Sequence, residues 1–320
     1  METVPAIPII IPIYNRPDFS GACLDTLYRS GCHGIPIWPI IVDNGSRLKT
    51  SRLIADWKKS WKDLPDDVRK DVAEPLVCRR PSNEGFAAAV NAGLASIKEA
   101  LPNSPNVCIM HNDCIPFPGW IGEMSACLAE ADEDVALITP RTDGANEASP
   151  RVASLAAAFQ SVKPSNKERL ASEEIVALVD KLYPDREACV KALADDSAVR
   201  MSYTPEISCF CMLVRGEVAF NYPKFDPDFW PRGWEEKWWF RNLERDGLVC
   251  CIANRAFVHH HNNATSDGPG FSFPDIMKVN EERYRAKCMA EIKDFHPNAD
   301  SKEKKPEAEN GSCQDGGKPV

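Results

Sequence analysis

The sequence predicts an α/β protein in which a mostly parallel sheet is flanked by helices. Two observations support this fold class. Between Ile7 and Met110, short β-branched apolar runs alternate with helix-like stretches. Each apolar run also ends in a polar or turn-forming string. Strand–helix–strand units with right-handed crossovers build parallel sheets, so this alternation favours a parallel sheet.

The first part of the chain holds four predicted strands. They are Ile7–Tyr14, Ile37–Val42, Leu76–Arg79 and Val107–Met110, with helices predicted at Asp18–Ser30 and Phe86–Ala100. Ligands of open α/β sheets bind at the carboxyl ends of the strands, because loops from neighbouring strands converge there. We therefore expect the polar strings that follow these strands to line one crevice.

The second part begins with a predicted helical insertion at about residues 142–205. It contains helix-like stretches at Ser154–Ser161, Lys167–Lys181 and Asp185–Ala194, and no strand pattern. A strand at Cys209–Val214, a tryptophan-rich helix at Gly233–Asp246 and a strand at Leu248–His259 follow. Residues 298–320 have a composition typical of disorder. We expect one domain over residues 1–297 and a disordered tail at 298–320.

The composition excludes several classes of protein. The formal net charge of −9 opposes non-specific binding to nucleic acid. The longest apolar run, Ile7–Ile13, contains two prolines and is far shorter than the ~20 residues of a membrane helix. The 13 cysteines include no CxxC pair, which favours buried free thiols in a reducing compartment. We expect a soluble, cytoplasmic protein.

A carboxylate, Asp43, directly follows the second predicted strand in the string Asp43-Asn44-Gly45-Ser46. An acceptor held at a strand end is suited to the ring N–H of a uracil-type base or to a ribose hydroxyl. The same pattern is also typical of an aspartate that caps a turn.

A glycine, Gly85, precedes the helix Phe86–Ala100. Asn83 or Ser82 is placed to cap this helix, and Gly85 allows a ligand or another backbone to come close. The amino end of a helix attracts anions such as a diphosphate. The alternative is a well-capped, alanine-rich helix without a ligand.

A third string, His111-Asn112-Asp113, follows the fourth predicted strand. One carboxylate facing the crevice is the minimum needed to join Mg²⁺ or Mn²⁺ to phosphate oxygens. Asn112 brings no charge, and His111 is either a second ligand or a packed ring.

Two adjacent acids, Glu235 and Glu236, stand at the start of the tryptophan-rich helix. Because adjacent side chains on a helix diverge, one of them can face the crevice as a general base while the other anchors a hydroxyl or the helix end. Tryptophan faces suit the C–H faces of sugars, although a helix with this many tryptophans more often packs them in a core. A solvated acid pair is the alternative for the two glutamates.

Three consecutive histidines, His259-His260-His261, end the last predicted strand. Imidazole suits Mn²⁺ and can complete a site begun by a carboxylate. Because side chains alternate along a strand, at most two of the three share a direction. A chance polar loop is the alternative.

Taken in this order, the strings resemble the family 2 glycosyltransferases of GT-A fold, a Rossmann-like α/β fold, and especially their rhamnosyltransferase-like branch. The resemblance rests on Ile11–Arg16, Val42–Ser46, Asn83–Gly93, His111–Asp113, Phe225–Phe229, Gly233–Glu236 and the histidine cluster. It covers about residues 5–265 without the insertion. It implies an enzyme that moves a sugar from a nucleotide-diphosphate sugar to an acceptor hydroxyl.

The resemblance also implies roles for single residues. It assigns nucleotide-sugar binding to Pro12, Tyr14, Arg16, Asp43, Asn83, Gly85, Phe86, Asn112 and Arg241. Asp113 stands for the surviving acid of the metal-binding DXD motif, with His111 in place of its first Asp, and His260 matches a late metal-binding histidine. Glu236 takes the position of the catalytic base, and Trp234 and Glu235 that of the acceptor site. The implied cofactor is Mn²⁺ or Mg²⁺.

Two other functions are compatible with the strings. A sugar-nucleotide pyrophosphorylase or other nucleotidyltransferase also uses a metal and a diphosphate, but it normally has a glycine-rich, basic loop near the N-terminus, and Ile11–Asp18 contains no glycine. A catalytically silent carbohydrate-binding module of the same fold is the second. No motif identifies the donor sugar, the oligomeric state or the acceptor, which is a saccharide, a lipid-linked glycan, a protein or a nucleobase.

Overall fold

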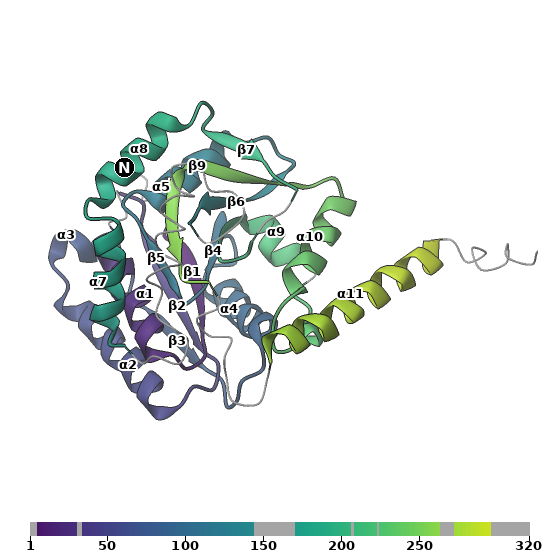
Figure 1. Cartoon of the computed structure of the whole chain (residues 1–320), viewed down its shortest axis with the longest axis horizontal. Helices are drawn as coiled ribbons and strands as arrows, with labels where there is room; N and C mark the ends of the chain where they lie inside the picture. The colour runs from purple at the N-terminus through teal and green to yellow at the C-terminus, as the bar shows by residue number, and fades with distance from the viewer. Residues whose placement is uncertain are drawn as a thin grey trace, which may run out of the picture.

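A single sheet runs through the part of the chain that the computed structural model describes, which comprises residues 5–30, 34–143, 170–205, 208–222, 224–262 and 272–295. Within these residues nine strands pair in the order β3-β2-β1-β4-β8-β6-β9-β5, and β7 pairs with β9 (Figure 1). The strands are β1 (Ile7–Ile13), β2 (Ile37–Asp43), β3 (Leu76–Arg79), β4 (Asn106–Met110), β5 (Cys114–Pro116), β6 (Val135–Arg141), β7 (Met201–Tyr203), β8 (Cys211–Arg215) and β9 (Val249–His260). The predicted α/β fold class is confirmed.

Helices cover both faces of this sheet. They are α1 (Pro17–Arg29), α2 (Leu48–Ser60), α3 (Asp66–Arg69), α4 (Phe86–Ala100), α5 (Trp120–Glu130), α7 (Ser172–Leu182), α8 (Arg186–Asp196), α9 (Gly216–Asn221), α10 (Glu235–Arg245) and α11 (Phe273–Phe295), with short 3₁₀ turns η1 (Trp61–Asp63) and η2 (Pro227–Phe229). Side chains of α1, α2 and α5 form one core with the sheet, and those of α4, α9 and α10 form a second core on the other face. The sheet is therefore buried on both sides.

The four strands predicted first form the parallel half of the sheet. β1 pairs in parallel with β2 and β4, and β2 pairs in parallel with β3. Side chains of β1 alternate between the two cores: Ile9 and Ile11 enter one, and Ile10 enters the other. Pro8 and Pro12 have no N–H to donate, and β1 pairs with β4 only at Ile9 and Ile10.

The other half of the sheet is more antiparallel than the strand pattern predicts. β8 lies antiparallel to β4 and to β6, and β5 and β7 lie antiparallel to β9, while β6 and β9 are parallel. The expectation that residues 142–205 contain no strand is wrong, because β7 lies there. The predicted helix Ser154–Ser161 and the predicted tail lie outside the described residues.

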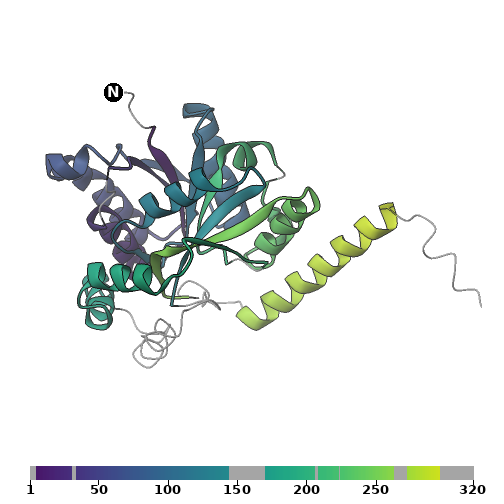
Figure 2. The same cartoon turned by 90° about the horizontal axis from the view of Figure 1, so that it is seen from above.

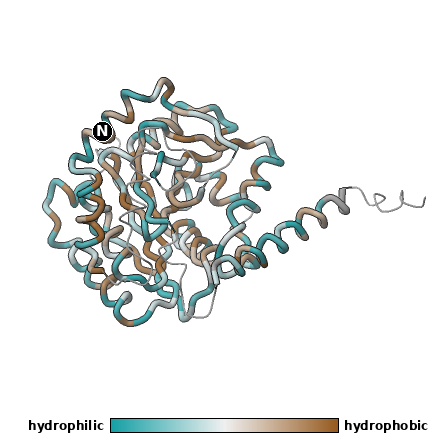
Figure 3. Tube along the Cα trace, in the orientation of Figure 1, coloured by the Kyte–Doolittle hydropathy of each residue, from teal (hydrophilic) through white to brown (hydrophobic). Residues whose placement is uncertain are grey.

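In Figure 2 the helices α7 and α8 lie at the left of the molecule and α11 extends to the right. α7 and α8 pack on a third apolar cluster that includes Phe19, Phe117 and Phe257. Figure 3 shows hydrophobic residues concentrated on the central strands and mostly hydrophilic residues along α11. The eleven cysteines of the described residues are free thiols, as the spacing predicts. No described helix combines the length and the apolar character that a bilayer crossing requires.

Candidate active site

Three side chains from two strand ends converge at the carboxyl end of β4. His111, Asp113 and His260 place one ligand atom each within 4.8 Å of the others. The pairing of β5 with the end of β9 sets Cys114 opposite His260, and the backbone N–H of His261 donates to the carbonyl of Asp113 at 3.1 Å. The sheet therefore fixes the backbone around this cluster.

The charge states of the cluster suit a divalent cation. Burial alone would raise the pKa of Asp113, but the rings of His260, His111 and His261 outweigh it and hold this pKa well below its usual range. Burial lowers the pKa of His111 to about 3, and His260 and Arg232 add to this effect. A carboxylate and imidazole nitrogens are donors that Mn²⁺ accepts. The residues present thus fit the predicted metal.

The histidine run separates into two faces, as strand alternation predicts. His260 faces Asp113, whereas His259 and His261 contact one another with ring centroids 4.5 Å apart, on the side of Phe19 and Tyr183. One histidine of the three therefore joins the cluster, and it is the predicted one.

The start of α4 lies directly against the loop that precedes α10. Gly85 is the N-cap of α4 with a φ of +88°, and a Cβ atom there would meet Trp230 Cδ1 at 2.9 Å. The N–H of Phe86 donates to the carbonyl of Pro231 at 2.9 Å. The prediction that Asn83 or Ser82 caps this helix is wrong, because the side-chain oxygen of Asn83 accepts from the N–H of Gly85 at 3.0 Å instead.

The contact between the start of α4 and the loop before α10 brings sequence motifs that are distant along the chain into one site. The ring of Phe86 meets the ring of His111 edge to face at 5.0 Å between centroids. The side-chain amide of Asn44, next to Asp43, donates to the carbonyl of Gly85 at 3.0 Å. The carboxyl ends of β2 and β4 are therefore connected through the first residues of α4.

The adjacent acids occupy the first two positions of α10, after Trp234 in the left-handed conformation. Glu235 is buried, and its Oε2 atom has no hydrogen-bond partner within the described structure. Burial and the neighbouring Glu236 raise the pKa of Glu235, and burial raises the pKa of Glu236. The charge of Arg232 acts on both carboxyls and on His111, so the acids and the metal-type cluster share one electrostatic neighbourhood. Strongly perturbed acids in such a place are typical of functional sites.

Several predicted nucleotide-binding side chains already have protein partners. Asp43 accepts from the N–H of Ser46 at 2.9 Å, from the hydroxyl of Ser51 at 2.8 Å and from Arg79. Arg16 donates to Asp18 from two nitrogens of its guanidinium group. In this structure both side chains thus stabilise the loops that carry them.

The remaining predicted residues differ in exposure and in the parts of the structure that they contact. Pro12 lies near the buried end of β1, and Tyr14 directly after this strand is exposed. The side chain of Asn112 donates to the hydroxyl of Ser20 at 2.8 Å. Trp234 packs on Tyr284 of α11, and Arg241 pairs with Glu291 on the same helix. The structure therefore turns Arg241 toward α11 rather than toward the cluster.

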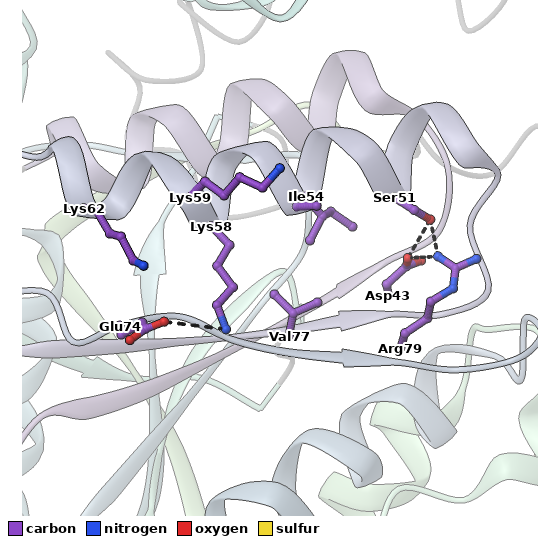
Figure 4. Close-up of a pocket in the computed structure, with 10 residues that line it drawn as sticks. Asp43, Ser51, Ile54, Lys58, Lys59, Lys62, Glu74, Val77 and Arg79 are labelled. Atoms are coloured by element: carbon purple, nitrogen blue, oxygen red, sulfur yellow. Dashed lines mark hydrogen bonds and ion pairs between the residues drawn. The ribbon is translucent and has the colours of Figure 1, made fainter.

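A cavity of about 420 Å³ opens between α2 and the edge strand β3 (Figure 4). The pair of Asp43 and Arg79 closes one end, and Lys58 and Glu74 approach each other to 3.8 Å near the other end. None of the three cluster residues lines this cavity. We place the candidate active site at the cluster, because its three side chains could hold a cation and the charge of Arg232 acts on both the cluster and the acids of α10.

Three residues of the site carry no clear signal in the sequence. His111 is ambiguous until its ring is seen beside Asp113 and His260. Arg232 lies in a tryptophan-rich segment whose adjacent acids, and not its arginine, are predicted to be functional. Asn280 on α11 is fully buried, and its amide nitrogen donates to the carbonyls of Phe229, Arg232 and Gly233 at 2.8–3.1 Å. Only tertiary contacts identify it.

Comparison with solved structures finds chains of similar fold. A crystal structure of GalNAc-T7 with UDP, GalNAc and Mn²⁺ superposes with a TM-score of 0.54 at 10% identity, over 81% of this chain and 44% of that one. A mannosyltransferase from Pyrobaculum calidifontis in complex with GDP-Man and Mn²⁺ gives 0.49 at 14% identity over 88% and 69% of the two chains, and S. aureus TarS gives 0.48 at 10% over 80% and 60%.

The chain thus spans less than half the length of the GalNAc-T7 chain, and at this identity the likeness shows the GT-A fold alone. No curated protein matches the chain in sequence. A family model described as glycosyl transferase family 2 matches residues 9–180, which is more than half of the sequence. The chain belongs to glycosyl transferase family 2.

Proposed function

We propose that this protein is an inverting glycosyltransferase that moves a sugar from a nucleotide-diphosphate donor to an acceptor hydroxyl. The observation that carries the proposal is the convergence of His111, Asp113 and His260, with the ring of Phe86 at the start of α4 lying 5.0 Å from the ring of His111. The presence of UDP and Mn²⁺ in the related GalNAc-T7 structure supports the same chemistry.

In this proposal His111, Asp113 and His260 hold Mn²⁺ or Mg²⁺. A cation bound there would neutralise charge on the departing diphosphate. The guanidinium of Arg232 adds a second positive charge in the same neighbourhood. Pro12, Tyr14 and the loop of Asp43 provide the nucleotide side of the crevice, as the resemblance implies. The first residues of α4 provide its diphosphate side.

Glu236 is the proposed general base. Its carboxylate takes a proton from the acceptor hydroxyl, whose oxygen attacks the anomeric carbon from the face opposite the diphosphate. The bond between this carbon and the diphosphate oxygen breaks, so the configuration inverts. Burial raises the pKa of Glu236, which brings its proton affinity closer to that of the group it must deprotonate. Glu235 and Trp234 bind the acceptor in this scheme.

The rhamnosyltransferase-like branch and the cytoplasmic location are further predictions from the sequence. The acceptor and the sugar are left to experiment. A screen of UDP-, GDP- and dTDP-sugars by thermal shift, with and without Mn²⁺, tests the donor site, because a ligand that binds the folded state raises the melting temperature.

We expect at least one nucleotide sugar to raise the melting temperature in the presence of Mn²⁺ and not in its absence. Release of the nucleoside diphosphate with transfer to an acceptor, and an inverted anomeric configuration by NMR, would then confirm the reaction. A silent carbohydrate-binding module would bind without releasing the diphosphate. A pyrophosphorylase would instead convert the nucleotide sugar and added pyrophosphate into a nucleoside triphosphate and a sugar 1-phosphate.

A further inference from the structure

A buried polar cluster lies on the face of β9 that is opposite to His260. The Oδ2 atom of Asp143 lies 2.5 Å from Nδ1 of His259 and accepts a hydrogen bond of 2.5 Å from the hydroxyl of Tyr183. Its Oδ1 atom accepts the backbone N–H of His260 at 3.4 Å. The side chains of His259 and Asp143 are inaccessible to solvent. None of these contacts involves the proposed reaction directly.

These residues come from three separate segments of the chain. Asp143 follows β6, His259 lies near the end of β9, and Tyr183 follows α7 in the insertion. The ring of Tyr183 packs on Phe117 and Phe257, with centroids 5.1 and 5.7 Å away. The insertion is thereby attached to the strand that ends in His260.

An ionised carboxylate in the interior is costly unless hydrogen bonds and charges compensate for its lost hydration. Three groups of the protein surround the carboxylate of Asp143: the ring of His259, the hydroxyl of Tyr183 and the backbone N–H of His260. The carboxylate of Asp143 in turn holds each of these partners in place.

Asp143 fixes two adjacent residues of β9 at once. It contacts the ring of His259 on one face of the strand and the backbone N–H of His260. These two contacts restrict movement of the end of β9. The ring of His260 on the other face lies with Nε2 3.2 Å from Asp113. A shift of the backbone here would move that ring away from Asp113.

We propose that Asp143 and Tyr183 are positioning residues for His260, so that the insertion sets the cation affinity of the His111–Asp113–His260 cluster. This inference rests on the proposed function of that cluster. Neither residue contacts the cation. Loss of an outer partner of a metal ligand typically lowers affinity about 10–100-fold.

The test measures Mn²⁺ binding to the full chain by the EPR signal of free Mn²⁺, at a temperature well below the melting point of each variant. We expect Asp143→Asn to weaken Mn²⁺ binding about 10- to 100-fold and Tyr183→Phe about 10-fold, at the lower end of the range typical of outer partners. Excess Mn²⁺ should restore the transfer rate of both variants, which a defect in folding alone would not allow.

Ser172→Ala is the matched control. Ser172 also lies on α7 and its hydroxyl donates to the carbonyl of Pro17 at 3.2 Å, far from the end of β9 in the sequence. Its removal weakens the attachment of α7 without touching Asp143, so Mn²⁺ affinity should stay within twofold of wild type.

The possible outcomes separate this inference from the proposed function. Wild-type affinity in both Tyr183→Phe and Asp143→Asn overturns the positioning role, and so does an equal loss in Ser172→Ala. If the wild type binds no Mn²⁺, or if His260→Ala binds it as tightly as the wild type, the proposed cation site itself fails. If Asp143→Asn does not fold, the Mn²⁺ affinity of Tyr183→Phe still tests the positioning role.

Discussion

The Nε2 atom of His260 lies 3.2 Å from the Oδ1 atom of Asp113, although the two residues stand at the ends of different strands, β9 and β4. The strand β5, which directly follows Asp113, pairs with the end of β9 and holds them together. An imidazole this close to a buried carboxylate, with His111 beside both, makes the cluster the centre of the proposed chemistry.

His260→Ala is predicted to weaken Mn²⁺ binding about 100-fold or more, because it removes one of the three proposed protein ligands. The measurement is a titration of Mn²⁺ by EPR. Asn112→Ala is the control: Asn112 lies between His111 and Asp113 in the sequence, but its side chain contacts Ser20. The control should lower the melting temperature and keep the Mn²⁺ affinity. Wild-type affinity in His260→Ala would remove this residue from the site.

Glu236→Gln is predicted to lower the rate of transfer about 10²- to 10⁴-fold, the range expected for loss of a general base. Donor binding by thermal shift should be unchanged, since the amide keeps the shape of the side chain. Glu244→Gln, an exposed residue of the same helix, should have wild-type activity. Full activity in Glu236→Gln would exclude it as the base.

The pH dependence of the wild-type rate gives a related prediction. Because burial raises the pKa of Glu236, the base becomes protonated at a higher pH than an ordinary glutamate does. We expect kcat/KM to fall on the acid side at a pH above the usual carboxylate range. An acid limb at or below pH ~4.3, the ordinary pKa of glutamate, would contradict this assignment.

Glu235→Gln is predicted to stabilise the protein at high pH. Burial and Glu236 raise the pKa of Glu235, so the folded state binds more protons than the unfolded state above the usual pKa of the group. The free energy of unfolding of the wild type therefore falls as pH rises through this window. Each unit of raised pKa corresponds to about 1.4 kcal/mol.

Glutamine carries no charge, so this loss is absent from the variant. The difference in melting temperature, variant minus wild type, should grow by a few degrees between pH 4 and pH 8. A difference that is the same at both pH values would show that Glu235 does not titrate in this way. Glu244→Gln provides the exposed control again.

Asn280→Ala is predicted to lower the free energy of unfolding by about 1–3 kcal/mol, since one buried and two partly buried carbonyls lose their donor. Two of these carbonyls belong to Arg232 and Gly233, just before the acids of α10, so transfer should slow as well. Val279→Ala, the neighbour on α11 with 47% of its surface exposed, should change neither quantity. Equal effects of the two substitutions would refute the role of Asn280.

The sequence predicts the parallel half of the fold well and the other half less well. β3 and α4 have the predicted bounds, because a short apolar run and a glycine before an alanine-rich stretch are strong local signals. β5 is three residues long and exists only through its pairing with β9. β7 and α11 likewise depend on partners distant in the sequence, for which no local pattern exists.

The same distinction applies to the candidate site. Asp113 and the histidine run follow apolar strands, a pattern that marks the carboxyl edge of a sheet, and the family resemblance then selects His260 among the three histidines. Asp143 and Asn280 were not, since an isolated Asp or Asn carries no signal until the fold surrounds it with carbonyls or imidazoles. Arg16 and Asp43 are at the predicted places, but their partners within the protein emerge only in three dimensions.

The alternation of β9 makes the spacing of its residues as important as their identity. Deletion of a single residue within Val249–His260 would turn the ring of His260 toward Tyr183 and present a neighbouring histidine to Asp113. Such a register shift would break both the contact of His259 with Asp143 and the contact of His260 with Asp113. Length variants of this strand should therefore be far less tolerated than substitutions along it.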